Sequence, residues 1–204
     1  MVKVKICGIT NKADAQKATD LGAWALGFIF AKQSPRSISP YKARTIIKEL
    51  PPFVTPVGVF VNQKAGAVMD IADFCGIQTL QFHGDESPMY LRRFKKFQCI
   101  KVFRVGDDFN ISGLSQFKAS AFCFDTFRSD TYGGSGQVFN WDVIKGKKFP
   151  VPVILSGGLN PENVAQAIKE LNPYAVDVAS GVEKAPGKKD HRLLEEFLEK
   201  AYSN

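Results

Sequence analysis

The sequence predicts a single-domain α/β protein over residues 1–204, with the architecture of a (β/α)8 TIM barrel. Eight short runs of β-branched and aromatic residues recur along the chain, and a segment with helical spacing accompanies each run. No linker or change of composition divides the chain. Eight such units give about 25 residues each, which is near the short limit of this barrel. A doubly wound open sheet with the same alternation is the alternative.

The predicted strands are short, and several are almost continuously apolar, which is typical of parallel strands buried on both faces. The first strand alternates Val or Ile with Lys, whereas most of the later ones are richer in Val, Ile and Phe. In chain order, we expect strands at Val2–Cys7, Ala23–Phe30, Thr55–Val61, Ile77–Phe82, Cys99–Phe103, Ala121–Asp125, Val151–Leu155 and Tyr174–Val178.

The segments between and after the strands have apolar residues at helical spacing. In chain order, we expect helices at Lys12–Leu21, Pro40–Leu50, Lys64–Cys75, Ser87–Phe97, Ile111–Phe117, Trp141–Lys145, Pro161–Leu171 and His191–Tyr202, of which the fifth is short. A strand followed by a helix, repeated throughout, indicates parallel strands joined by crossover helices.

Composition favours a cytoplasmic protein with one large core. Hydrophobic residues make up 45% of the chain and charged residues 23%, and the longest apolar stretch, 23–31, is only strand-sized. The first seven residues lack the apolar core of a secretory signal. The cysteines are far apart with no C-x-x-C pair, and only His83 and His191 offer imidazoles, so the sequence does not favour a zinc site.

The net charge of +7 suits an anionic substrate, and it also suits nucleic acid. The run Arg92–Phe97 interleaves basic and aromatic residues, and its spacing predicts an amphipathic helix with a solvated basic face. We therefore expect a small phosphorylated molecule as the partner, and neither nucleic acid nor a membrane.

Two glycine-containing loops predict a phosphate site. Ser156, Gly157 and Gly158 follow the seventh strand, and Ser180 and Gly181 follow the eighth. Backbone amides without bulky side chains can surround a phosphate, and the loops after strands seven and eight are where barrels often hold one. The alternative is that these glycines only form tight turns.

A thiol and a carboxyl group end two other strands. Cys7 shares the parity of Lys3 and Lys5 and points inward if Val4 and Ile6 face the helices, so as a thiolate it could take a proton from carbon. Asp125 ends the sixth strand, where a carboxyl group in partly apolar surroundings can act as a general acid. A small buried Cys and a capping Asp are the alternatives, and we expect structural roles for Cys75, Cys99 and Cys123.

Two further side chains follow strand ends. Arg36 lies in the loop after the second strand, and its planar guanidinium can bind a carboxylate through two parallel hydrogen bonds. A solvated loop arginine is the alternative. His83 ends the fourth strand, and we interpret it first as a structural group that hydrogen-bonds a backbone carbonyl.

Together these segments resemble the phosphoribosylanthranilate isomerases along the whole chain. The matching motifs are Lys5–Thr10, Gly27–Phe30, Ser34–Arg36, Val57–Asn62, Gln81–Gly84, Phe124–Thr126, Gly133–Gly136, Leu155–Leu159 and Val176–Glu183. The K-I-C-G-I-T opening and the S-G-V-E closing stretch are specific in combination, whereas the glycine-rich pieces alone are not.

The resemblance implies an Amadori rearrangement in tryptophan biosynthesis, with no cofactor and no metal, by a monomer or homodimer. By motif match, Asp125 is the general acid that protonates the furanose ring oxygen, and Cys7 is the general base that takes the proton from C2′. Arg36 would hold the anthranilate carboxylate. Ser156, Gly157, Gly158, Ser180 and Gly181 would hold the phosphate, and His83 and Asp177 join the substrate-binding residues without a defined role.

Two departures from the family pattern are visible, since Asn140 and Ala179 stand where Asp and Ser are usual. Asn140 can still cap a helix, and Ala179 leaves the backbone amides available. Two alternatives stay open. One is a related phosphate-binding barrel enzyme, such as indole-glycerol-phosphate synthase or a ribulose-phosphate epimerase, which would need a different catalytic set. The other is a non-catalytic anion-binding or nucleic-acid-binding protein.

Overall fold

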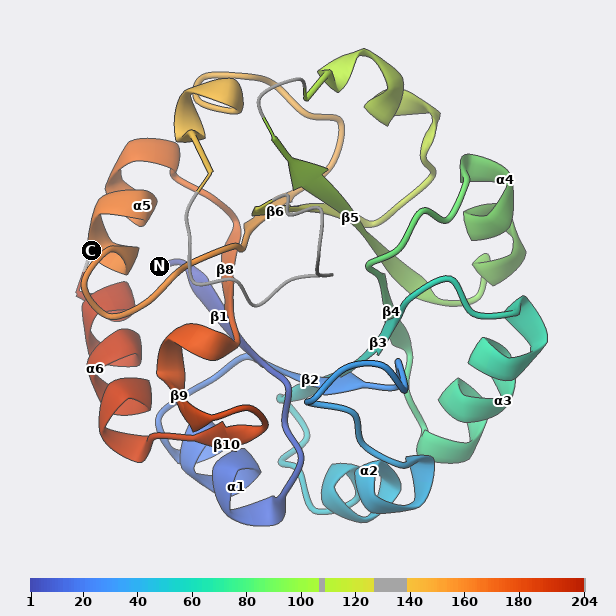
Figure 1. Ribbon diagram of the computed structural model, residues 1–204, viewed down its shortest axis with the longest axis vertical. Helices are drawn as coiled ribbons and strands as arrows, with labels where there is room; N and C mark the ends of the chain where they lie inside the picture. Colours follow the sequence, from blue (N-terminus) through green and yellow to red (C-terminus); the bar gives the residue numbers. More distant parts are fainter. Residues whose placement is uncertain (107–108, 127–138, 204) are drawn as a thin grey trace.

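The computed structural model describes residues 1–106, 109–126 and 139–203. In these residues, eight parallel strands close into a barrel in sequence order, and helices surround it (Figure 1). The predicted (β/α)8 fold and all eight strands are confirmed. The strands are β1 (Lys3–Cys7), β2 (Ala25–Ile29), β3 (Thr55–Phe60), β4 (Thr79–Phe82), β5 (Gln98–Val105), β6 (Ala121–Thr126), β7 (Val153–Leu155) and β8 (Ala175–Val178). The Gly133–Gly136 motif lies outside the described residues.

The helices differ from the prediction more than the strands do. The α-helices are α1 (Lys12–Asp20), α2 (Pro40–Ile47), α3 (Ala65–Cys75), α4 (Pro88–Leu91), α5 (Val164–Leu171) and α6 (His191–Tyr202). The 3-10 helices are η1 (Arg92–Phe94), η2 (Ile111–Gln116), η3 (Trp141–Val143) and η4 (Ser180–Val182). None of the helices in the described part of the chain is both long and apolar enough to cross a membrane.

Four predicted helices are shorter or tighter than expected. The one predicted at Trp141–Lys145 is the 3-10 helix η3, and the other three differ for local reasons. The segment predicted at Ser87–Phe97 is a single α-helical turn followed by η1, which buries Phe94 and leaves the flanking basic side chains exposed. The segment at 111–117 contains Gly113 and two serines, which are poor helix formers, and is a 3-10 helix. The segment expected from Pro161 becomes helical only at Val164, because Asn160 Oδ1 accepts the amides of Glu162 and Asn163 in a turn.

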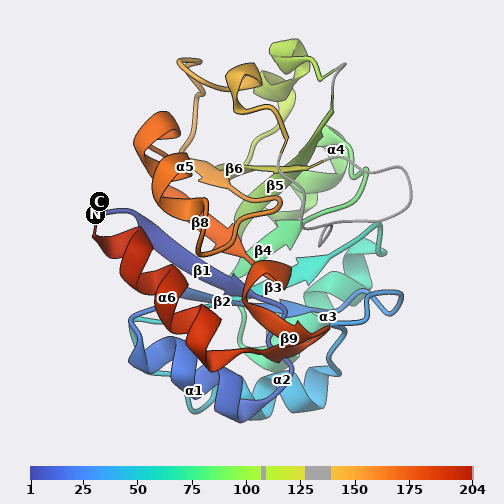
Figure 2. The ribbon, with the colours of Figure 1, turned by 60° about the vertical axis from the view of Figure 1, so that its left-hand side comes forward.

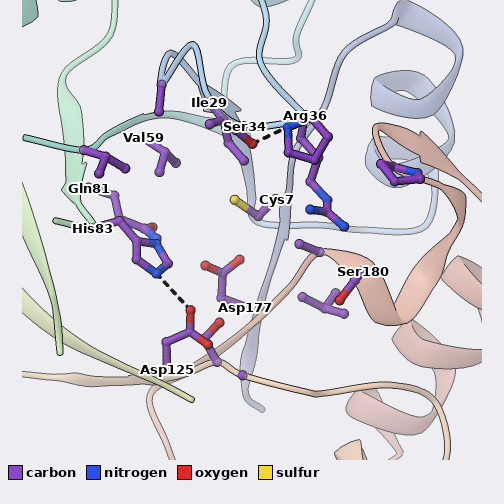
Figure 3. Close-up of a pocket in the computed structure, with 18 of the residues that line it drawn as sticks. Cys7, Ile29, Ser34, Arg36, Val59, Gln81, His83, Asp125, Asp177 and Ser180 are labelled. Carbon is purple, nitrogen blue, oxygen red and sulfur yellow. Dashed lines mark hydrogen bonds and ion pairs between the residues drawn. The ribbon is translucent and has the colours of Figure 1, made fainter. Parts of the chain in front are cut away.

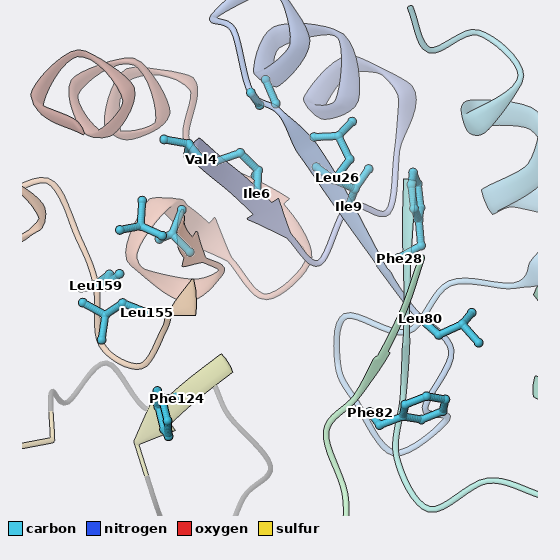
Figure 4. Close-up of a cluster of buried hydrophobic side chains, with 14 of the residues drawn as sticks. Val4, Ile6, Ile9, Leu26, Phe28, Leu80, Phe82, Phe124, Leu155 and Leu159 are labelled. Atoms are coloured by element: carbon cyan, nitrogen blue, oxygen red, sulfur yellow. The ribbon is translucent and has the colours of Figure 1, made fainter. Parts of the chain in front are cut away.

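Alternation along each strand creates two cores. Side chains such as Val4, Ile6, Phe28 and Phe124 point outward and pack beneath the helices (Figure 4). A smaller cluster fills the barrel interior and consists of Val57, Ile100, Val102, Ala121, Cys123, Ile154 and Ala175. Inward positions near the carboxyl ends of the strands are instead polar, which opens the interior toward a site at that end.

Strand register determines which polar side chains meet there. Lys5 of β1 lies opposite Asp177 of β8, and Cys7 lies opposite Gly27 of β2. A Cβ at position 27 would lie 2.7 Å from Cys7 Sγ and 3.1 Å from Lys5 Nζ. Glycine at this position therefore makes room for both side chains against β2.

A small antiparallel hairpin, which the sequence did not predict, covers the carboxyl end of β1 (Figure 2). Its strands are β9 (Glu183–Ala185) and β10 (Lys188–Lys189). The chain then enters α6, which packs beside α1 and closes the ring of helices (Figures 1 and 2).

Candidate active site

A pocket of about 520 Å³ lies at the carboxyl ends of the barrel strands, where the sequence placed the site (Figure 3). The predicted site residues that line it are Cys7, Arg36, His83, Asp125, Ser156, Gly157, Gly158, Asp177 and Ser180. Gly181 does not line it. Its Cα packs on the backbone of the preceding loop, where a side chain would overlap the carbonyl of Leu159. Gly181 therefore allows the loops after β7 and β8 to approach each other.

Cys7 points inward, as its parity predicted, while Val4 and Ile6 are fully buried on the helix side. Burial raises the pKa of the Cys7 thiol above its ordinary value, and the nearby Lys5 ammonium partly offsets this effect. Cys7 is therefore mostly a thiol near neutral pH. The thiolate that does form is a stronger base than that of an ordinary cysteine.

Beneath the thiol lies a buried ion pair, in which Lys5 Nζ donates to Asp177 Oδ2 at 2.6 Å. Burial lowers the pKa of the Lys5 ammonium, but the Asp177 carboxylate outweighs this effect and raises the pKa above the ordinary value. Asp177 Oδ1 is buried and has no hydrogen-bond partner among the residues that the structure describes. Since Asp177 also lines the pocket, this oxygen is available to a donor on a ligand.

Asp125 stands across the pocket from Cys7, with His83 beside it (Figure 3). Its Oδ1 accepts the amide of Thr126 at 2.8 Å, and its Oδ2 lies 2.9 Å from His83 Nε2. The His83 nitrogen has no other partner in the described residues and is not aligned for a good hydrogen bond. No hydrogen bond from the His83 ring to a backbone carbonyl is found in the described residues, and its Nε2 faces the Asp125 carboxylate.

Arg36 is not a solvated loop arginine, which was the alternative interpretation of the sequence. Its Nε lies 3.0 Å from both carboxylate oxygens of Glu183, and its Nη2 lies 2.8 Å from Oε2. The Arg36 side chain is only 12% exposed. Glu183 occupies one edge of the guanidinium, and Nη1 has no hydrogen-bond partner in the described part of the chain. The edge formed by Nη1 and Nη2 can thus receive a second carboxylate.

The two loops at β7 and β8 present backbone amides at the pocket. Gly157 and Gly158 have φ angles of 86° and 67°, a left-handed conformation that glycine adopts without strain. The amides of Gly157, Gly158, Ser180 and Gly181 have no hydrogen-bond partner in the described residues, whereas the Ser156 amide is bonded to the Phe124 carbonyl. Gly157, Gly158 and Ser180 line the pocket and can therefore offer their amides to an anion there. Gly181 does not line it, and Ser156 contributes only its side chain and position.

Several functional candidates escaped the sequence analysis. Gln81 is 1% exposed and lines the pocket, and its Oε1 has no hydrogen-bond partner within the described ranges. Lys189 is fully buried and bonds to Glu183 and to the Cys7 carbonyl. Inward parity on a barrel strand could have identified Gln81, but no local pattern marks a buried lysine in a short hairpin. In the described part of the chain, no cluster of three or more His, Cys, Asp or Glu could hold a metal ion.

Comparison with known proteins gives a consistent result. The sequence model of the N-(5'-phosphoribosyl)anthranilate (PRA) isomerase family matches residues 4–200. An N-(5'-phosphoribosyl)anthranilate isomerase of Pelobacter propionicus is 45% identical over 198 residues, covering 97% of this chain and 94% of the relative.

Solved structures agree with this match. The phosphoribosyl anthranilate isomerase of Thermotoga maritima superposes with a TM-score of 0.92 at 40% identity, with both chains fully covered. A phosphoribosyl anthranilate isomerase in complex with reduced 1-(o-carboxyphenylamino)-1-deoxyribulose 5-phosphate gives a TM-score of 0.86 at 39% identity, again with full coverage of both chains. Monomers generated from the dimeric Thermotoga maritima protein give 0.84 at 38% identity, also with full coverage.

Proposed function

Because the chain belongs to the N-(5'-phosphoribosyl)anthranilate isomerase family of tryptophan biosynthesis, we propose that its pocket rearranges N-(5'-phosphoribosyl)anthranilate through Asp125 and Cys7. The product is 1-(2-carboxyphenylamino)-1-deoxyribulose 5-phosphate, and the reaction takes place in one catalytic domain, residues 1–204. The observation that carries the proposal is the presence of a carboxyl group and a thiol on opposite sides of one pocket. The reaction opens one carbon–oxygen bond and transfers protons within the substrate, and it needs neither cofactor nor metal.

Asp125 is the general acid of the first step. Its proton passes to the furanose ring oxygen, the bond from C1′ to that oxygen breaks, and the anthranilate nitrogen supplies the electrons that form a protonated imine. The Thr126 amide holds one carboxyl oxygen, and His83 lies beside the other. These contacts fix the direction in which the acid faces the sugar.

Cys7 is the general base of the second step. The cationic imine accepts electrons from the bond between C2′ and hydrogen, so this proton becomes acidic enough for a thiolate to remove. The enolamine that forms then tautomerises to the ketone. The raised pKa of the Cys7 thiol makes its thiolate a stronger base, at the expense of a smaller thiolate population near neutral pH.

The remaining polar groups hold the substrate at both ends. Arg36 binds the anthranilate carboxylate through its free edge, and the amides of the β7 and β8 loops bind the phosphate. Asp177 Oδ1 and Gln81 Oε1, both buried without partners, accept hydrogen bonds from the sugar hydroxyls. Binding at three points positions C1′ and C2′ between the acid and the base.

Purified protein should consume N-(5'-phosphoribosyl)anthranilate, generated in the assay, with loss of its anthranilate fluorescence. We expect Cys7→Ala and Asp125→Asn each to lower kcat by about 10²–10⁴-fold with the fold intact by circular dichroism. Near-normal turnover by either variant would remove that residue from the mechanism. Failure of the unaltered protein to turn over this substrate would reject the proposed reaction.

The remaining parts of the proposal concern assembly and location. Met1 and Phe53 are each 91% exposed, and both precede barrel strands, so they lie at the amino-terminal end of the barrel. Of the two states that the sequence left open, these exposed apolar side chains favour a homodimer over a monomer.

All four cysteines are free and buried, which is compatible with the reducing cytoplasm that we propose as its location.

A further inference from the structure

Lys189 is a buried cation that the proposed mechanism does not use. It is 0% exposed, and its ammonium has three acceptors, namely the carbonyls of Cys7 at 2.6 Å and Ala179 at 3.0 Å and Glu183 Oε1 at 3.0 Å. An ammonium has three protons, so all three are used. Lysine is almost never fully buried unless it is paired. The three acceptors come from different parts of the site, which indicates a connecting role.

The first two acceptors belong to the barrel itself. Cys7 ends β1, and Ala179 follows β8, directly before the loop that carries Ser180. These strands are neighbours in the barrel. The ammonium therefore joins two adjacent strand ends and is held in a fixed position relative to the barrel.

The third acceptor, Glu183, links Lys189 to Arg36. Glu183 is 4% exposed, binds Lys189 through Oε1, and binds the Arg36 guanidinium through both oxygens. The amide of Gly187 also donates to Oε1 at 3.3 Å. The loop after β2, which carries Arg36, is thereby connected through two side chains of the β9–β10 hairpin to the ends of β1 and β8.

We propose that Lys189 and Glu183 are positioning residues that orient the free edge of the Arg36 guanidinium toward the carboxylate of the substrate. This inference rests on the proposed function, since it assigns the carboxylate to Arg36. Glu183 occupies the Nε side of the guanidinium and leaves Nη1 and Nη2 for the ligand. Lys189 also offsets the charge of Glu183, so the three side chains together carry one net positive charge toward an anionic ligand.

The experiment compares two ligands that differ only in the group that Arg36 would bind. One is reduced 1-(2-carboxyphenylamino)-1-deoxyribulose 5-phosphate, and the other is the same compound without the carboxylate. We expect Lys189→Met to weaken binding of the first by about tenfold or more, and of the second by less than about threefold. The matched control is Lys188→Met, since Lys188 is exposed on the same strand and should leave both dissociation constants unchanged.

A double-mutant cycle with Arg36→Met tests whether Lys189 acts through Arg36. On that background, Lys189→Met should change the affinity for the carboxylated compound by less than about twofold. Equal weakening of both ligands, or full additivity with Arg36→Met, would overturn the proposal in favour of a general structural role. An unchanged affinity would overturn it as well.

Glu183→Gln provides a second variant in case Lys189→Met does not fold. A glutamine has one acceptor oxygen, and its NH2 group would face the N–H donors of Arg36. The two-oxygen pairing should therefore be lost, and the carboxylated compound should bind about five- to tenfold more weakly. Tighter binding would instead show that Glu183 only competes with the ligand, and the proposal would fail. Failure of the proposed function can be distinguished from failure of this proposal. In that case the unaltered protein would neither turn over the substrate nor prefer the carboxylated ligand.

Discussion

At the scale of single residues, the protonation of Cys7 is the property that controls the proposed chemistry. Burial disfavours its thiolate, and the Lys5 ammonium on the same face of β1 favours it. Lys5 stays protonated because Asp177 lies 2.6 Å away. Reactivity therefore depends on two neighbours of opposite charge, and not on the thiol alone.

The pH at which the Cys7 thiolate forms should therefore depend on both neighbours. Lys5→Met removes the charge that favours the thiolate, so thiolate formation should move to higher pH than in the unaltered enzyme. Asp177→Asn removes a charge that disfavours the thiolate and should move thiolate formation to lower pH. Turnover needs this thiolate together with a protonated Asp125, so the pH profile of kcat/KM should also change in both variants.

The measurement is kcat/KM against pH for the three proteins, together with the ultraviolet absorbance of the thiolate in the absence of substrate. Cys7→Ser supplies the baseline for the absorbance titration. Thiolate absorbance that appears at the same pH in all three proteins would show that Lys5 and Asp177 do not control the protonation of Cys7.

At the scale of elements, the strands were predictable and the connections less so. Runs such as those of β3 and β6 are buried on both faces, so their composition alone identifies them. The helices after β4, β5 and β6 are all short. Phe94 is buried in the 3-10 turn after β4, and the helix after β5 contains glycine and serine. Hydrophobic periodicity alone does not predict where such helices end. The β9–β10 hairpin has strands of three and two residues, too short for any alternation to show.

The candidate site also contains parts that the sequence predicts and parts that it does not. Cys7, Asp125 and the amide loops were predictable because they end strands that were themselves predictable. The partner of Arg36 was not, since Glu183 is 147 positions away in sequence and meets it only through the hairpin. Lys189 has no local pattern that predicts burial, and it is buried because it pairs with Glu183. The parity of Lys5 placed it on the inward face with Cys7, but its ion pair with Asp177 could not be predicted.

Asp14 joins three elements and supports a prediction about stability. Its carboxylate accepts the Asn11 side chain at 2.7 Å and the Lys189 amide at 2.9 Å, and it lies 2.9 Å from His191 Nε2 at the start of α6. Burial raises the pKa of Asp14, but these hydrogen bonds outweigh it, so the pKa is lowered. Asp14→Asn should reduce the free energy of unfolding by about 1–3 kcal/mol near neutral pH.

The pH dependence of this effect has a definite sign. A carboxyl group with a lowered pKa stabilises the fold above its unfolded pKa, and the contribution is lost as the pH falls through the folded value. The difference in stability between the two proteins should therefore narrow below about pH 4. Denaturant unfolding at several pH values measures it, with the exposed Asp20→Asn as the control. A constant difference across this range would contradict the assignment.

At the scale of the whole molecule, every residue of the proposed active site comes from one chain, at the carboxyl end of the barrel. The exposed Met1 and Phe53 lie at the opposite end, before β1 and β3. The proposed assembly surface and the proposed active site thus lie at different ends of the molecule. A homodimer formed through the amino-terminal end would leave each pocket complete and accessible.

Phe53→Asp should accordingly separate the subunits without loss of catalysis. We expect the unaltered protein to have twice the chain mass of 22.5 kDa by light scattering at micromolar concentration, and the variant to have the single-chain mass, because a charge cannot be buried in an apolar contact without a partner.

Tyr41→Asp is the control, since Tyr41 is 77% exposed but lies at the first turn of α2, on the catalytic side. kcat/KM per chain should remain within about twofold in the separated variant, because the residues that line the pocket all belong to one chain. A single-chain mass for the unaltered protein, or a dimer that persists in the variant, would assign Phe53 no part in assembly; loss of activity on separation would show that the two ends of the barrel are coupled.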